Sequence, residues 1–307
     1  MSYRIDPHRP LTAEFRRIAQ VQIGKIMEDL AAARTLPEVK LHDCRKRLKK
    51  FRGLLRLVRA ANPHLCRAEN VRYRDMARSL AGGREATALI ETVDRLAKEF
   101  PEEGDGLAGL RKALHMRRAR LLHEAAGLDA EIAAALESCG QGREALAALS
   151  LPDEPEAAGD LLAGGAHHIM RRTAKALAAA GDHGREDTFH ELRKGVKAHW
   201  MHLRLLHDFW PKPIRSRRKA VEELGERLGE LQDLFVLRRI LREEGPKLVS
   251  QEEIALARSL LKRSEKRLRK QCLHEAERLF VDAPPRKVTR RLAKNYRAEA
   301  RPDAHAR

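Results

Sequence analysis

The chain has 307 residues, of which 43% are hydrophobic, 35% charged and only 4% aromatic, and its formal net charge is +18. A hydrophobic share near the globular norm of about 45–50% excludes wholesale disorder, and richness in Leu, Ala, Arg and Glu favours helices over a β architecture. The cationic excess indicates a polyanionic partner, and no apolar run approaches the ~18 residues of a membrane span, so we expect none.

The first half of the chain predicts a series of helices, because apolar residues recur three and four positions apart. The second helix starts at residues 35–38 (Thr-Leu-Pro-Glu), which resemble a capping box with an early proline. Acidic residues 101–106 are predicted as a loop, and Gly82-Gly83 as a break. The predicted helices cover residues 15–30, 35–60, 65–80, 85–100, 107–126 and a small-residue tail to 149.

The second half repeats the first at an offset of 148 residues. Residues 41–49 and 189–197 share the form apolar-His-acid-x-Arg-Lys-x-apolar-Lys, and Pro63 and Pro211 end the two His-bearing helices. Recurrence at one offset indicates an internal repeat, with a Pro- and acid-rich linker at 151–156. The sequence therefore predicts an all-α fold with a first helical repeat at 10–150, a second at 158–281 and a loosely held basic tail at 282–307.

The first His-bearing helix carries two neighbouring stripes of side chains. Its predicted core stripe is Leu41, Cys44, Leu48, Phe51, Leu55 and Val58. One residue further on, a stripe consists of His42, Arg45, Lys49, Arg52, Arg56 and Arg59. Because one residue turns a helix by ~100°, these cations flank the core stripe and are expected at the rim between core and water.

The second copy keeps this arrangement with fewer cations. Its predicted apolar side is Phe189, Leu192, Val196, Leu203, Leu206 and Trp210, interrupted by His199. The stripe one residue on is His190, Arg193, Lys197, Trp200, Arg204 and His207. We expect the first copy to carry more of the charge, and Trp200 either to pack or to lie against an Arg as a cation–π partner.

A cationic stripe with few acids suits an extended chain of phosphates, since its cations recur about every ~5.4 Å along the helix. Arg can fork two phosphate oxygens, Lys acts as a point charge, and such binding weakens with salt. The alternative is a solvated charged face whose helix pairs contribute only ~0.2–0.5 kcal/mol each. Further cations converge on the stripes if their helices pack beside them: Arg111, His115, Arg118, Arg263, Lys266, Arg267 and Lys270.

The matched histidines His42 and His190 have three conceivable roles: anion donor, metal ligand or phosphoacceptor. No further His or carboxylate has the spacing of a metal site, and adjacent His167 and His168 point ~100° apart on a helix. Donation to phosphate fits best. A bound polyanion is then expected to raise the pKa of both histidines, and binding to strengthen below about pH 6.5.

At these residues the sequence resembles the CHAD family, the conserved-histidine α-helical domain, over about residues 10–281. The resemblance rests on two matched sets, His42, Arg45, Lys46 and Lys49, and His190, Arg193, Lys194 and Lys197. It implies a duplicated four-helix bundle with internal pseudo-twofold symmetry and a basic central cleft that binds inorganic polyphosphate. It further implies a binding module, often found at polyphosphate granules, rather than an enzyme. We expect no cofactor and no metal.

The sequence departs from the family pattern at two places. Segments 80–89 and 228–237 carry Arg84-Glu85 and Gln232-Asp233 where the family tends to have Arg-Asp. The carboxylate remains in both copies, so a helix-start or Arg-orienting role is expected. Trp200 also stands where the first copy has Arg52, which argues against a fully symmetric site.

Two other functions compete with polyphosphate binding. Nucleic acid is the alternative partner, because phosphate contacts alone do not distinguish the polymers, although few aromatics argue against single-strand stacking. An enzyme acting on phosphoanhydrides would need a carboxylate cluster for metal, and the acids fall mostly in loops or on opposite faces. Four scattered cysteines and a polar N-terminus without a signal core indicate the cytoplasm.

Overall fold

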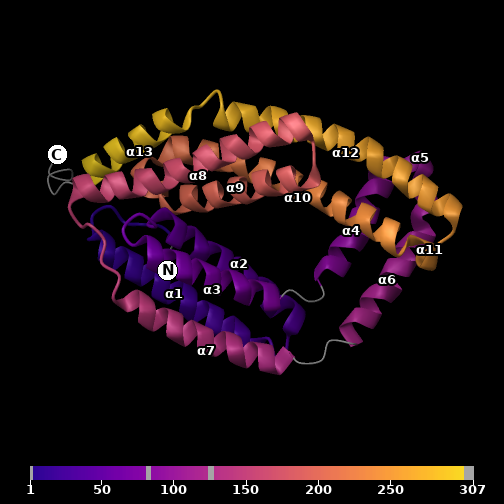
Figure 1. Cartoon of the computed structure of the whole chain (residues 1–307), viewed down its shortest axis with the longest axis horizontal. Helices are drawn as coiled ribbons and strands as arrows, with labels where there is room; N and C mark the ends of the chain where they lie inside the picture. The colour runs from indigo at the N-terminus through magenta and orange to yellow at the C-terminus, as the bar shows by residue number, and fades with distance from the viewer. Residues whose placement is uncertain (1–2, 81–83, 124–127, 301–307) are drawn as a thin grey trace.

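The computed structural model describes residues 3–80, 84–123 and 128–300, and these are all-α (Figure 1). The longer helices of the first half are α1 Leu11–Ala32, α2 Pro37–Leu57, α3 Pro63–Ser79, α4 Arg84–Glu99, α6 Ala108–His123 and α7 Leu128–Ala147. Those of the second half are α8 Pro155–His183, α9 Glu186–Leu205, α10 Pro211–Glu243, α12 Gln251–Phe280 and α13 Pro285–Glu299. The short helices are α5 Pro101–Gly104, η1 Asp105–Leu107, η2 His207–Phe209 and α11 Gly245–Leu248.

Proline begins six of these helices, where its missing N–H costs nothing and its fixed φ suits the first turn. Pro37 begins α2 as predicted. The predicted capping box is wrong, because Thr35 is not the N-cap residue of α2. The N-cap residue is Leu36, without a side-chain cap, and the Thr35 hydroxyl donates backwards to the Ala32 carbonyl at 3.1 Å. The predicted loop at 101–106 is also wrong, since α5 and η1 form there behind Pro101.

The two halves differ most where the sequence predicted matched segments. In the first half, α3 ends at Ser79 and α4 begins at Arg84, and the predicted break at Gly82-Gly83 lies outside the described residues. In the second half, residues 228–237 lie inside one continuous helix, α10. The repeat therefore keeps the helix order, α1–α2–α3 against α8–α9–α10, while two helices of the first copy correspond to one in the second.

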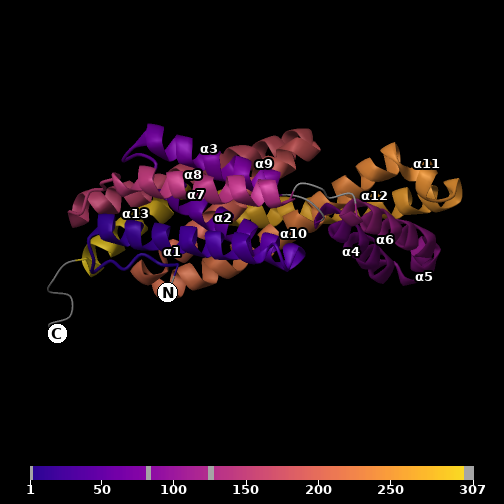
Figure 2. The same cartoon turned by 90° about the horizontal axis from the view of Figure 1, so that it is seen from below.

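The helices pack in two groups, with the larger forming a main body. In this body α1 packs against α2 and α7, α8 against α9 and α13, and α2 touches both α8 and α9. A smaller distal bundle consists of α4, α6 and the adjoining parts of α10 and α12, and it stands apart from the body in Figure 2. Helices of both sequence repeats thus build the distal bundle, while residues 10–150 and 158–281 remain the predicted repeat limits.

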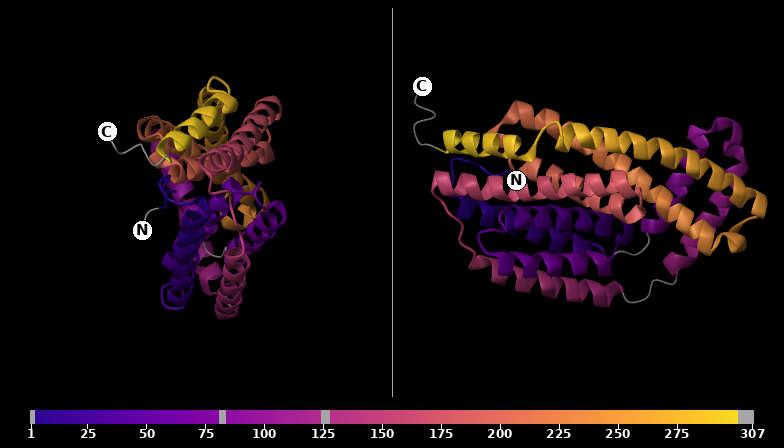
Figure 3. Two further views of the ribbon diagram at one scale, coloured as in Figure 1. Left: turned by 90° about the vertical axis from the view of Figure 1, so that its left-hand side faces the viewer. Right: turned by 45° about the horizontal axis from the view of Figure 1, so that its top comes forward.

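The C-terminal basic segment is packed rather than loosely held. Helix α13 lies along α8, as the right-hand view of Figure 3 shows, and buries Leu292 and Tyr296. Arg297 bridges to α8 through Glu156 at 2.6 Å and Asp160 at 2.5 Å. The prediction of a loose tail is therefore wrong for residues 285–299, because apolar side chains spaced three and four apart give this cationic helix a buried face.

Helices α2 and α9 meet at a pair of repeat-equivalent positions. A Cβ on Gly53 would lie 2.8 Å from Cβ of Met201, which is 148 residues further on. Near this contact the His202 Nε2 donates to the Gly53 carbonyl at 3.2 Å. Contact between equivalent residues is what a twofold axis through the meeting point would produce; the axis itself stays a prediction.

Candidate polyanion-binding site

The two predicted apolar stripes form the core of α2 and α9. Each predicted apolar member is buried or half-buried, and the buried interruption at His199 is accommodated by Arg217, whose Nε donates to His199 Nε2 at 2.9 Å. The neighbouring cationic positions are mostly half-buried, as a rim position requires. Helical phasing alone therefore placed both stripes correctly.

The two histidine ends of the stripes point toward the distal bundle. His190 Nδ1 lies 3.2 Å from Gln232 Oε1 on α10, and the adjacent Asp233 pairs with Arg95 of α4 at 3.2 Å. In the first half α3 leads to α4, and its antiparallel partner α2 must begin on that same side. His42 and His190 therefore both lie toward the junction between main body and distal bundle.

The paired carboxylates of the family motif orient arginines across this junction. Asp233 of α10 accepts from Arg95 of α4, and Glu85 of α4 lies 3.5 Å from Arg239 of α10. Glu85 also sits in the first turn of α4, where a carboxylate is stabilised by the helix dipole. Both expected roles thus occur, helix start at Glu85 and arginine orientation at both positions, whereas the Arg84 side chain lies outside the described residues.

The far end of the α2 stripe approaches helix α8. Burial and the neighbours Arg56, Arg74 and Arg78 lower the pKa of Arg52 to about 10. Burial and Arg172 of α8 lower the pKa of Arg56. These guanidinium groups lose solvation and repel one another, so the arrangement is electrostatically costly without an anion.

The far end of the α9 stripe has different neighbours. The Arg204 guanidinium lies 4.9 Å from the ring centroid of Trp200 and 5.7 Å from that of Tyr3, which confirms the cation–π alternative for Trp200. Burial and then Arg204 lower the pKa of Lys50 on α2. Lys50 and Arg204 are thus two neighbouring half-buried cations, and Lys50 was not among the predicted site residues.

Two glycines of α10 give room to the middle of the α9 stripe. A Cβ on Gly229 would lie 3.3 Å from Arg193 Nη2, and one on Gly225 would lie 3.3 Å from Lys197 Cε. The two long stems therefore lie across α10 at these glycines. The motif lysines lie outside these contacts: Lys46 pairs with Asp43 at 3.3 Å, and Lys194 with Glu191 at 2.5 Å.

Several of the further predicted cations lie in the distal bundle and are neutralised there. Arg111 pairs with Asp94 at 2.6 Å, Arg263 with Glu103 at 2.7 Å and Arg267 with Glu99 at 2.8 Å. His115 on α6 and Lys266 and Lys270 on α12 are exposed, and Arg118 is half-buried. The structure does not bring the three paired arginines onto the α2 or α9 stripe.

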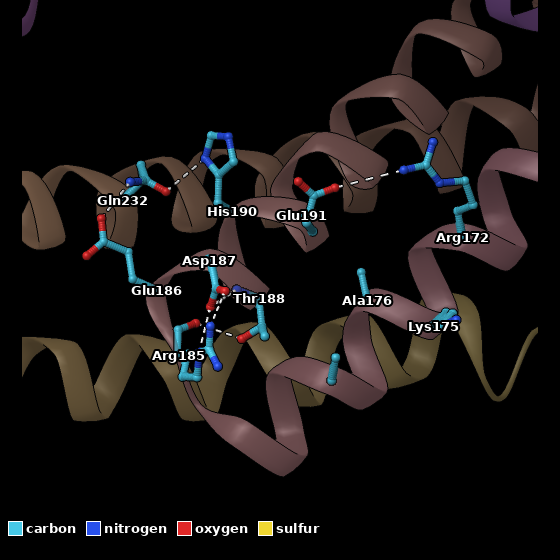
Figure 4. A pocket seen from close by; sticks show the side chains of 11 residues that line it. Arg172, Lys175, Ala176, Arg185, Glu186, Asp187, Thr188, His190, Glu191 and Gln232 are labelled. Carbon is cyan, nitrogen blue, oxygen red and sulfur yellow. Dashed lines mark hydrogen bonds and ion pairs between the residues drawn. The ribbon is translucent and has the colours of Figure 1, made fainter.

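A cavity of about 1060 Å³ opens where α8, α9 and α10 meet (Figure 4). His190 is the one predicted site residue in its lining. The remaining charged and polar lining side chains, which sequence reasoning missed, are Arg172, Lys175, Arg185, Glu186, Asp187, Thr188, Glu191 and Gln232. For Arg172 and Lys175 the sequence does carry a signal, because they follow His168 at spacings of four and three and so share one face of α8.

Neither a metal site nor a membrane span emerges from the described part of the chain. Among those residues, no three His, Cys, Asp or Glu side chains gather as metal ligands would. No described helix is long and apolar enough to cross a bilayer. The four cysteines are unpaired and buried, as core residues of four different helices.

The chain is similar to known proteins in both sequence and fold. The model of the CHAD domain family matches residues 17–242. A crystal structure of the CHAD domain from the plant Ricinus communis is similar in fold, with a TM-score of 0.59 and 20% identity over 95% of this chain and 96% of that one. No curated protein matches the sequence.

Proposed function

The chain belongs to the CHAD domain family, and with this membership as premise we propose that it binds inorganic polyphosphate through the stripes of α2 and α9. The proposed role is that of a binding module without catalytic activity, associated with polyphosphate granules. The ligand is a linear chain of phosphates, whose closely spaced charges match cations that recur along a helix face.

One observation carries the proposal: half-buried cations in and beside the stripes have other cations as close neighbours, which lower their pKa. Besides burial, Arg56 acts on Arg52, Arg172 acts on Arg56, and Arg204 acts on Lys50. A merely soluble basic surface would spread such charges apart or pair them with acids, as the distal bundle does. A polyanion between these side chains would relieve the repulsion, and its counterion release would drive binding.

Nucleic acid is the competing ligand, since it offers the same phosphate chemistry. The chain has only 4% aromatic residues, and Trp200, the aromatic member of the cationic stripes, is half-buried against the Arg204 guanidinium rather than exposed for base stacking. These features favour a ligand without bases.

The deciding experiment is competition between long-chain polyphosphate and duplex DNA for the intact protein across a salt series. We expect polyphosphate to displace DNA at every salt concentration, with affinity for both falling steeply as salt rises. Displacement of polyphosphate by an equal concentration of DNA phosphate would overturn the proposal.

A charge-reversal variant locates the site. Replacing Arg45, Lys49, Arg193 and Lys197 with Glu is expected to abolish polyphosphate binding, because repulsion replaces attraction at both stripes. Circular dichroism should show unchanged helicity. Retained binding by the folded variant would place the site away from the stripes.

A further inference from the structure

The α2 stripe has a cationic neighbour that belongs to the other sequence repeat. Arg59, which ends this stripe, donates through Nη1 to His168 Nε2 of α8 at 2.5 Å. One turn earlier, Arg56 lies near Arg172 of the same helix. The last two turns of the stripe are therefore connected to α8, whereas Arg204 of the α9 stripe lies beside Tyr3 and Lys50.

Helix α8 presents its own row of cations on this side. Its cations are Arg172 and Lys175, and His168, the neutral acceptor of Arg59, precedes them at spacings of four and three, so the three share one face over about 10 Å. Arg172 and Lys175 line the cavity near His190, and Figure 4 shows Arg172 reaching from α8 toward Glu191 of α9. The row thus leads from the end of the α2 stripe into the cavity.

The acids near this row hold its cations weakly. Arg172 and Glu191 lie 3.9 Å apart with 63% and 47% of their side chains exposed. Exposed pairs of this kind are weak because water screens them, so a phosphate group can take the place of Glu191. Glu191 is in addition shared with Lys194 at 2.5 Å.

The first repeat lacks the equivalent row. The positions 148 residues before His168, Arg172 and Lys175 are Gln20, Gly24 and Met27 on α1, and none carries a charge. A cationic second wall therefore exists beside the α2 stripe and is missing from the corresponding helix of the other repeat.

We infer that α8 forms the second wall of a polyphosphate track, in which Arg59, His168, Arg172 and Lys175 carry the chain from the α2 stripe into the cavity at His190. This inference rests on the proposed function and deepens it, because it assigns residues outside both His-bearing helices to the same ligand. The proposed site is then asymmetric between the two repeats, because the polyphosphate follows α2 and α8 before it reaches α9.

The test compares two charge-reversal pairs of equal size. Arg172→Glu/Lys175→Glu changes the proposed wall, and Arg215→Glu/Lys219→Glu changes two exposed cations near the start of α10 by the same amount of charge. Titration with long-chain polyphosphate at several salt concentrations should show at least a tenfold loss of affinity for the α8 variant. Its log affinity against log salt should be less steep by about two, and the α10 variant should stay within threefold of the parent protein.

The outcomes separate the inference from the proposed function. A parent protein that does not bind polyphosphate refutes the function itself. If the parent protein binds polyphosphate, two results refute the α8 wall. In one, the α8 variant binds as well as the parent protein; in the other, the α8 and α10 variants lose affinity equally. Unchanged thermal unfolding of both variants is expected, because all four side chains are exposed.

Discussion

Two histidines on α9 are fully enclosed in the main body, and each leaves Nδ1 buried without a hydrogen bond in the described residues. His199 accepts from Arg217 through Nε2, and His202 donates through Nε2 to the Gly53 carbonyl. Burial, aided by Arg217, holds the pKa of His199 well below its usual range, and burial with Arg56 lowers that of His202 to about 3. Both side chains are therefore neutral in the folded protein near neutral pH.

This burial predicts a stability that falls with acid. The unfolded chain protonates His202 at its ordinary pKa near ~6.5, whereas the folded chain resists protonation down to about 3. Stability is therefore fully present above about pH 6.5 and is lost as pH falls toward 3, by up to about 1.4 kcal/mol per pH unit for this group. His202→Gln keeps a donor for Gly53 and should lose about 1 kcal/mol less than the parent between pH 7.5 and 5.5.

Urea unfolding at the two pH values measures this difference, and His183→Gln, at the exposed end of α8, is the matched control that should behave like the parent. An identical loss in His202→Gln and the parent protein would show that His202 does not carry the effect.

Residue identity predicted which side chains are buried but not which ones meet. The apolar stripes and the Trp200–Arg204 pair followed from phasing, because a helix fixes the direction of its own side chains. Lys50 and Arg172 were missed because their neighbours come from helices far away in the sequence. Charge and spacing within one helix carry no information about such partners.

At the level of elements, α2 and α8 approach so closely that only glycine fits at one position. A Cβ on Gly165 would lie 1.9 Å from the Leu57 carbonyl oxygen, and backbone cannot move aside as a side chain can. The contact positions α8 against the end of α2, where the proposed polyphosphate track begins. This glycine therefore links helix packing to the geometry of the site.

We predict that Gly165→Ala destabilises the protein by about 1–3 kcal/mol, the usual cost of overpacking. The neighbouring Gly164 is exposed and has no atom within 4 Å of an added Cβ, so Gly164→Ala should instead stabilise it by about 0.5–1 kcal/mol through helix propensity. Urea midpoints of both variants decide the matter. Equal effects of the two substitutions would mean that α8 and α2 separate without cost.

Helix existence was largely predictable, while continuity was not. Pro37 and the spacing of apolar residues located the longer helices of the first half to within a few residues, whereas Pro63 and Pro211 were predicted only as helix ends and in fact begin α3 and α10. Residues 80–89 and 228–237 look alike, yet the second segment remains helical through Gly229. A glycine inside a helix costs only about 1 kcal/mol, so packing against α4 and α9 decides whether the helix continues.

On the scale of the whole molecule, cations fall into two populations that sequence did not separate. Arg263 and Arg267 of the distal bundle pair with Glu103 and Glu99, which lie more than 150 residues earlier in the chain. Arg52 and Arg56 of the main body lie close to other cations. Both pairs were predicted as site residues from their charge and their spacing along a helix, and neither property reveals a partner that tertiary packing supplies.

This division predicts different salt dependences. Each cation that neutralises a phosphate releases counterions, so losing one reduces the slope of log affinity against log salt by about one. Arg52→Gln/Arg56→Gln should reduce the slope for polyphosphate by about two. Arg263→Gln/Arg267→Gln should change it by less than one, since these guanidinium groups are already neutralised by carboxylates. Equal slopes for the two variants would mean that polyphosphate displaces the distal ion pairs and covers the whole molecule. Polyphosphate would then be held by the total charge of the protein rather than by the stripes.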